Sequence, residues 1–166
     1  MVCSSAGDQS QPAATPSDVG GAIVAWYDGR NPDNINIYAQ RLDASGTIQW
    51  PSGGVPVCAA SGSQTNALVV PDGSGGALVI WSDLRATSSD LYAQRMSSSG
   101  LPQWALDGVV VCDEPHQQSS ALLVADGSGG AMVGWIDQRP GDGDEYESDV
   151  YAQRLDALGT REWAPQ

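Results

Sequence analysis

Lysine and phenylalanine are both absent from this 166-residue chain, and histidine occurs only once. All seven basic residues are arginines, and against twenty acidic residues they leave a formal net charge of −13. So acidic a chain repels phosphate backbones and anionic membrane surfaces at neutral pH, which argues against nucleic acid as a partner. No apolar run approaches the roughly 20 residues of a membrane-spanning helix. Residues 1–10 also lack the charged and apolar regions of a secretory signal, so we expect neither membrane insertion nor a targeting signal in this chain.

Cysteine is scarce, and its three positions, 3, 58 and 112, are an odd number. They do not form the paired framework of a small disulfide-rich domain, and we expect small, buried apolar side chains at one equivalent position of a repeat. Together with the lone His116 they give little support to a metal site. His116 also has no identifiable nucleophile partner, and no glycine-rich loop leads from a strand into a helix. We therefore expect a protein that is not an enzyme and has no cofactor.

An internal repeat governs the whole sequence. A Cys, a Trp, a Tyr and a second Trp recur in that order three times, and Cys to first Trp spans 23 positions each time (3 to 26, 58 to 81, 112 to 135). Tyr to second Trp spans 12 positions each time (38 to 50, 92 to 104, 151 to 163), whereas first Trp to Tyr varies as 12, 11 and 16. Fixed spacing around one variable step predicts a repeated unit with a single loop of variable length.

Each repeat predicts four antiparallel strands. In the second repeat, residues 66–71 (NALVVP) and 77–83 (ALVIWSD) flank an Asp-Gly-Ser-Gly-Gly turn, and residues 90–96 (DLYAQRM) follow as the third strand. Asp-Gly and Gly-Gly supply the positive φ values that tight hairpins need. We place the fourth strands at TIQW, LPQW and TREW, residues 47–50, 101–104 and 160–163. The variable loop then joins the second and third strands of an all-β chain.

Four strands in about 54 residues with two fixed tryptophans are typical of a propeller blade. The segments DGSGGALVIWSDLR (72–85) and DLYAQRMSSSGLPQW (90–104), with their counterparts, cover essentially the whole chain. They resemble the repeats of bacterial β-propellers from large secreted or surface proteins, and the resemblance implies an extracellular or cell-surface location. The turn also resembles the Asp-box of sialidase-like propellers, but the S-x-D-x-G-x-T-W spacing is absent and no such activity is implied. A β-trefoil, also with four strands per repeat, is the alternative fold.

The repeat divides the chain into a single domain of three blades, about 1–54, 55–108 and 109–166. Propellers ordinarily have four to eight blades, and three do not readily close a ring. The first and last residues read as two halves of one connector, so the end of one chain can meet the start of another. We expect a homodimer forming a six-bladed ring, with a trimer or a fragment of a longer propeller as alternatives.

Two polar motifs recur with the repeat. W-x-D-x-R ends each second strand, and a Gln follows each Cys by six positions. The Arg of Tyr-Ala-Gln-Arg (Arg41, Arg95 or Arg154) lies beside a small Ala, where it can reach an Asp. These groups form either an ion-pair network at blade junctions or a symmetric set of ligand pockets. The candidate binding residues are Gln9, Gln64, Gln118, Asp28, Asp83, Asp137, Arg30, Arg85 and Arg139.

The tryptophans allow two interpretations as well. Trp26, Trp81 and Trp135 are expected to fill the spaces between blades. The second set, Trp50, Trp104 and Trp163, is placed on the outer strand, where packing competes with stacking against sugar rings.

Specificity is expected on the face formed by the variable loops and the segments after each Cys, because binding is usually installed on loops of a rigid scaffold. The longest of these loops, residues 140–149, contains Asp142 and Asp144, a weak calcium candidate whose order does not match a standard calcium loop. An acidic, solvated loop is the alternative. We expect a non-catalytic, lectin-like binding or adhesion module for a carbohydrate or protein ligand, or a purely structural assembly repeat.

Overall fold

The computed structural model describes residues 1–18, 20–139 and 148–164 and is all-β in these residues. Within them no helix is long and apolar enough to cross a membrane. The strands are β1 Gln9–Pro16, β2 Ala22–Asp28, β3 Asn36–Leu42, β4 Val55–Cys58, β5 Gln64–Pro71, β6 Ala77–Asp83, β7 Asp90–Met96, β8 Val109–Cys112, β9 Gln118–Ala125, β10 Ala131–Asp137 and β11 Asp149–Leu155.

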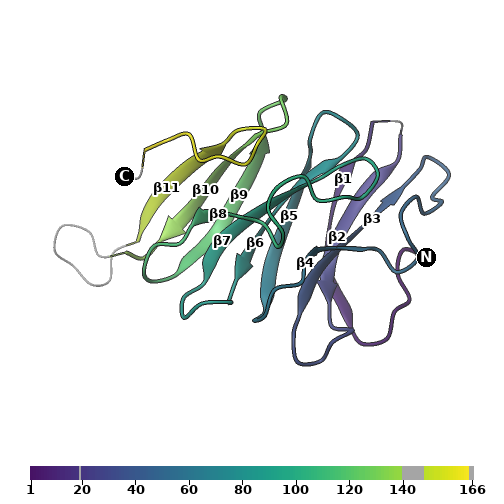
Figure 1. The fold of residues 1–166 in the computed structure, drawn as a ribbon, viewed down its shortest axis with the longest axis horizontal. Helices are drawn as coiled ribbons and strands as arrows, with labels where there is room; N and C mark the ends of the chain where they lie inside the picture. Colours follow the sequence, from purple (N-terminus) through teal and green to yellow (C-terminus); the bar gives the residue numbers. More distant parts are fainter. Residues whose placement is uncertain (19, 140–147, 165–166) are drawn as a thin grey trace.

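The strands form three separate antiparallel sheets, each made from consecutive strands. Sheet 1 contains β1 to β4, sheet 2 contains β5 to β8, and sheet 3 contains β9 to β11 among the described residues. The sheets lie side by side in a row, and β11 and the N-terminus lie at opposite ends of that row (Figure 1). The first strands of the sheets are neighbours, since β1 contacts β5 and β5 contacts β9.

The turn between the first two strands of sheet 2 shows why this sequence makes a tight hairpin. Asp72 Oδ1 accepts hydrogen bonds from the backbone N–H groups of Ser74 and Gly76, both at 2.8 Å. Gly73 and Gly75 have φ of +75° and +82°, a region that side chains disfavour. The predicted second and third strands of this repeat, residues 77–83 and 90–96, are confirmed as β6 and β7.

The predicted fourth strands are wrong. Residues 47–50 and 101–104 contribute only isolated bridges, such as Leu42 to Ile48, and the fourth strands β4 and β8 come later, ending at Cys58 and Cys112. The side chain of Gln40 accounts for the difference, because its Oε1 accepts from Trp50 N–H at 2.9 Å and its Nε2 donates to Pro51 O at 2.9 Å. A side-chain amide thus holds the tryptophan segment where a strand ladder was expected, and Trp50 precedes the outer strand.

Two apolar cores lie between the three sheets, one at each junction. In sheet 2 every residue of β6 is buried, and its side chains alternate between the two cores. Val79 and Trp81 pack toward sheet 1, whereas Leu78 and Ile80 pack toward sheet 3. A strand that is apolar on both faces belongs to a sheet covered on both sides.

Candidate functional site

The W-x-D-x-R motif folds back on itself at the end of β2. Trp26 Nε1 donates to Asp28 Oδ2 at 2.8 Å, and Arg30 donates to both carboxylate oxygens of Asp28, with Nε at 2.6 Å and Nη2 at 2.7 Å. The Asp28 side chain is fully buried. Bidentate pairing of this kind fixes the orientation of both groups. The same ion pair recurs at Asp83–Arg85 and Asp137–Arg139.

The guanidinium groups also lie on aromatic rings of the neighbouring strand. The Cζ atom of Arg30 is 3.7 Å from the ring centre of Tyr38, and the matching distance from Arg85 to Tyr92 is 3.8 Å. Arg85 Nη2 further donates to the backbone oxygen of Asp107 at 2.8 Å, just before β8. Arg30 and Arg85 therefore each connect the second strand of their sheet to the third strand and to the segment before the fourth.

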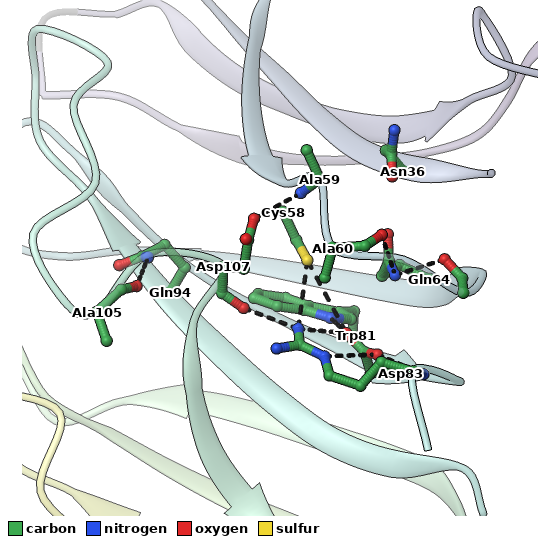
Figure 2. A network of polar contacts seen from close by, with 12 residues as sticks. Asn36, Cys58, Ala59, Ala60, Gln64, Trp81, Asp83, Gln94, Ala105 and Asp107 are labelled. Atoms are coloured by element: carbon green, nitrogen blue, oxygen red, sulfur yellow. Dashed lines mark hydrogen bonds and ion pairs between the residues drawn. The ribbon is translucent and has the colours of Figure 1, made fainter. Parts of the chain in front are cut away.

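A cysteine from the preceding sheet completes the clusters of sheets 2 and 3. Arg85 Nη2 lies 3.4 Å from Cys58 Sγ, and the Cys58 thiol lies 3.9 Å from Asp83 Oδ2 (Figure 2). Cys58 ends β4 of sheet 1, whereas Asp83 and Arg85 belong to sheet 2. The contact therefore crosses the junction between two sheets.

The electrostatic state of the clusters follows from these contacts. Burial alone would raise the pKa of Asp137, but hydrogen bonds from Arg139 and Trp135 outweigh it and lower the pKa to about 2. The same balance lowers the pKa of Asp28. Burial raises the pKa of the Cys58 and Cys112 thiols to about 12 and about 11. At neutral pH these aspartates are ionised and these thiols are protonated, so neither Cys58 nor Cys112 is an activated nucleophile.

The repeated glutamines after each Cys support loops. Gln64 and Gln118 are buried, and Gln9 is partly exposed. Gln64 Nε2 donates to the backbone oxygen of Gly62 at 2.7 Å, and Gln118 Nε2 donates to that of His116 at 3.2 Å. The side chains of Gln64 and Gln118 are directed at their own loops. Each of these loops joins the fourth strand of one sheet to the first strand of the next.

The arginines of Tyr-Ala-Gln-Arg make a second set of polar contacts near the turns. Arg95 pairs with Asp72 at 2.9 Å, and Arg154 pairs with Asp126 at 3.1 Å. In sheet 1 the position of Asp72 is taken by Ser17, and Arg41 instead donates to the backbone oxygen of Ser98 in sheet 2 at 2.9 Å. The nine sequence-predicted binding residues and these arginines therefore all hold strands, loops or adjacent sheets together.

Tryptophans of the second set pack against the following sheet. Trp50 is 5% exposed, its Nε1 donates to Ser98 O at 3.0 Å, and its ring lies under Gly100. Trp104 makes the same contacts with Ala157 and Gly159 of sheet 3. Trp163 follows sheet 3 and is 42% exposed.

The calcium candidates Asp142 and Asp144 lie outside the described residues. Within residues 1–18, 20–139 and 148–164 no group of three or more His, Cys, Asp or Glu side chains is arranged to hold a metal ion.

An open hollow of about 590 Å³ between the first strands was not anticipated from the sequence. Gln11, Asn66 and Ser120 line it, with φ of +48°, +55° and +51° at the same position of β1, β5 and β9. The pairing register slips beside each of them, which is the signature of a β-bulge. The available signal was a polar residue two positions after each repeated Gln. The lining residues carry no charge.

A second cavity, of about 270 Å³, lies along the outer edge of β11. Trp135, Tyr151 and Gln153 of sheet 3 line it, together with Val111 and Cys112 of β8. Among the described residues, no strand pairs with this edge of β11, whereas the matching edges of β3 and β7 pair with β4 and β8. No protein-family model and no curated protein sequence matches this chain.

Proposed function

We propose that this chain is a non-catalytic assembly scaffold: three blades of a β-propeller that complete a ring by packing their end sheets against those of a second copy. A six-bladed homodimer is the proposed assembly. The observation that carries the proposal is the apolar outer face of sheet 3. There Leu122 is 71% exposed and Val150 is 84% exposed.

The same face of sheet 2 is covered. Leu91, which corresponds to Val150, is 0% exposed and lies in the core between sheets 2 and 3. Leu78 and Ile80 share that face and are also buried. Because exposed contiguous apolar patches mark interaction surfaces, the outer face of sheet 3 is suited to cover by another sheet of the same kind.

The opposite end of the row carries the complementary surface. Val24 and Trp26 of sheet 1 occupy the positions of Val79 and Trp81, which in sheet 2 pack against the preceding sheet. Val24 and Trp26 line a hollow of about 230 Å³ on the outer side of sheet 1. Sheet 3 of one copy and sheet 1 of another can therefore form a third type of junction with the same side-chain classes as the two within the chain.

The polar contacts favour a scaffold over a loop-face binding module. The repeated Asp, Arg and Gln side chains bond to neighbouring strands, loops and sheets. Residues already held in buried ion pairs would have to break those pairs in order to contact a ligand.

The proposal is tested by sedimentation equilibrium at micromolar concentration. We expect wild type at twice the mass of one chain, and Leu122→Asp at the mass of one chain, because a buried unpaired carboxylate opposes the junction. Leu158→Asp is the matched control, since Leu158 is 80% exposed but corresponds to the exposed Ser45 and Ser99. A wild-type mass of one chain would refute assembly through a second copy.

A binding function at the open hollow between the first strands is a second candidate. It is favoured by the three polar residues with positive φ that line this hollow. Non-glycine residues in this region cost roughly 1 to 2 kcal/mol each and cluster at functional sites. The uncharged lining favours a neutral, hydroxyl- or amide-bearing ligand. NMR titration with a panel of neutral oligosaccharides should shift the Asn66 side-chain amide in wild type and show no binding in Asn66→Ala. Unchanged spectra with every oligosaccharide would rule out glycans as this ligand.

A further inference from the structure

The open edge of β11 differs from its counterparts in a single component, the fourth strand. In sheet 2, Leu91 pairs with Cys112, Tyr92 pairs with Val110, and β8 covers the edge of β7. In sheet 3 the corresponding Val150 and Tyr151 have no such partner among the described residues. The unused backbone groups of an exposed edge are a ready template for another strand.

The first three residues of the chain lie where such a strand would end. Arg30 Nη2 is 3.9 Å from Cys3 Sγ, and the Cys3 thiol donates to Gly53 O at 3.7 Å. Arg85 is related to Cys58 in the same way, at 3.4 Å, and Cys58 ends the fourth strand of the preceding sheet. Residues 1–3 thus occupy, against sheet 1, the place that β4 occupies against sheet 2.

We propose that Met1–Cys3 of a second copy add to the open edge of β11 as the end of its fourth strand. This inference rests on the proposed function, because the addition occurs when sheet 1 of the second copy packs on sheet 3. The register follows from the two internal examples, in which Cys58 lies opposite Ile37 and Cys112 lies opposite Leu91. Cys3 of the second copy therefore lies opposite Val150.

The side chains agree with this register. Val57 and Val111, each directly before the Cys, are buried at 3% and 2% exposure in the two internal junctions. Val2 has the corresponding position, so the added segment brings one apolar side chain and one thiol into the junction. The backbone hydrogen bonds of the edge supply affinity, and the alternate side chains supply specificity, as in other strand additions.

A site-specific disulfide tests the register. Directly opposite residues of an antiparallel pair have Cβ atoms about 4.5 to 5.5 Å apart, close to the separation that a disulfide accepts. We expect Val150→Cys, oxidised with oxidised glutathione, to give a covalent dimer through Cys3 as its main product. The disulfide forms from two thiols, and glutathione is reduced. The strand β11, which contains Val150, and the N-terminus lie at opposite ends of the row of sheets, so one chain cannot make this bond within itself (Figure 1).

Two controls identify the partner. Val150→Cys combined with Cys3→Ser should give no covalent dimer by itself, yet should crosslink when mixed with wild-type chains that retain Cys3. Leu158→Cys should not crosslink, although its position is equally exposed. Circular dichroism confirms that each variant is folded.

The outcomes separate the two proposals. A wild-type dimer by sedimentation, with a folded Val150→Cys variant that is also dimeric and does not crosslink to Cys3, would overturn strand addition and leave the assembly function standing. A wild-type monomer would overturn the assembly function itself. Crosslinking that persists in the Cys3→Ser double variant alone would place another cysteine at the junction and would also overturn the inference.

Discussion

Sheets 2 and 3 contain nearly the same motif but differ in what covers them. In β6 every side chain is buried, whereas in β10 the residues alternate between buried and exposed or partly exposed. The W-x-D-x-R cluster is nevertheless formed in both sheets, with the closest Arg–Asp contact at 2.6 Å in each. The difference shows that the polar cluster is built within a sheet and toward the sheet before it, while the burial of the outer face depends on the sheet that follows.

The largest effects should come from removing the polar cluster, and they should be equal in the two sheets. We expect Asp83→Ala and Asp137→Ala each to lower the free energy of unfolding by about 3 kcal/mol or more, because a partly buried Arg loses its partner. Urea unfolding followed by tryptophan fluorescence measures the loss. Asp→Asn variants, which keep the acceptor for the Trp indole, should lose less. A much smaller loss for Asp137→Ala would show that the cluster requires a following sheet.

Truncating the equivalent apolar side chain should have different effects on stability in the two sheets. Leu91→Ala should cost about 2 to 5 kcal/mol, since it leaves a cavity in a packed core. Val150→Ala should cost less than about 0.5 kcal/mol when measured in the monomeric Leu122→Asp background, because the side chain is exposed there. Equal losses at the two positions would mean that Val150 is covered within a single chain.

Acid should weaken the clusters of sheets 1 and 3, which contain Asp28 and Asp137. The pKa of Asp28 is lowered and that of Asp137 falls to about 2, so their stabilising contribution is fully present above the ordinary carboxylate pKa of about 3.9. It is lost as the pH falls through the folded-state value. We therefore expect the melting temperature to drop between about pH 4 and pH 2, and to drop less in Asp137→Asn. A melting temperature constant over this range would contradict ionised, paired aspartates.

The smallest predicted effect is an increase in stability. His116 has φ of +74°, whereas the corresponding Gly7 and Gly62 have φ of +80° and +86°. His116→Gly should raise the free energy of unfolding by up to about 1 kcal/mol through relief of backbone strain, offset in part by the greater flexibility of the unfolded chain. Its backbone oxygen still accepts from Gln118, so the loop is retained. A loss of stability would mean that the imidazole makes a compensating contact.

Much of the fold could be predicted, because the repeat fixes the second and third strands and their turn. The continuous apolar run that begins at Ala77 and the Asp-Gly turn are local signals, and β6 and β7 follow them. The fourth strand could not be placed from local signals. TIQW contains β-forming residues, whereas β4 has only four residues and contains Pro56, which an edge strand tolerates. The decisive contact, Gln40 to the Trp50 segment, joins positions ten residues apart.

The candidate sites were partly predictable for similar reasons. The Arg of W-x-D-x-R follows by two residues the Asp that ends the strand, so their pairing follows from spacing. The thiol contact from Cys58 comes from another sheet and required the three-dimensional arrangement. The bulges at Gln11, Asn66 and Ser120 depend on a backbone conformation that Gln and Ser do not favour, so a polar residue at this position was too weak a signal to predict them.

The direction of the cysteine contact has a consequence for how such chains can be joined. Cys58 and Cys112, which end fourth strands, contact the aspartate and arginine of the sheet that follows. These contacts therefore all run in one direction along the row of sheets. In the proposed assembly, head-to-tail packing of two copies continues the direction of these contacts from one chain into the next, whereas packing two like ends against each other would reverse that direction. Circularly permuted chains that begin at a different sheet keep the direction of these contacts and should fold. Chains with a reversed sheet order within the row would lose the contacts.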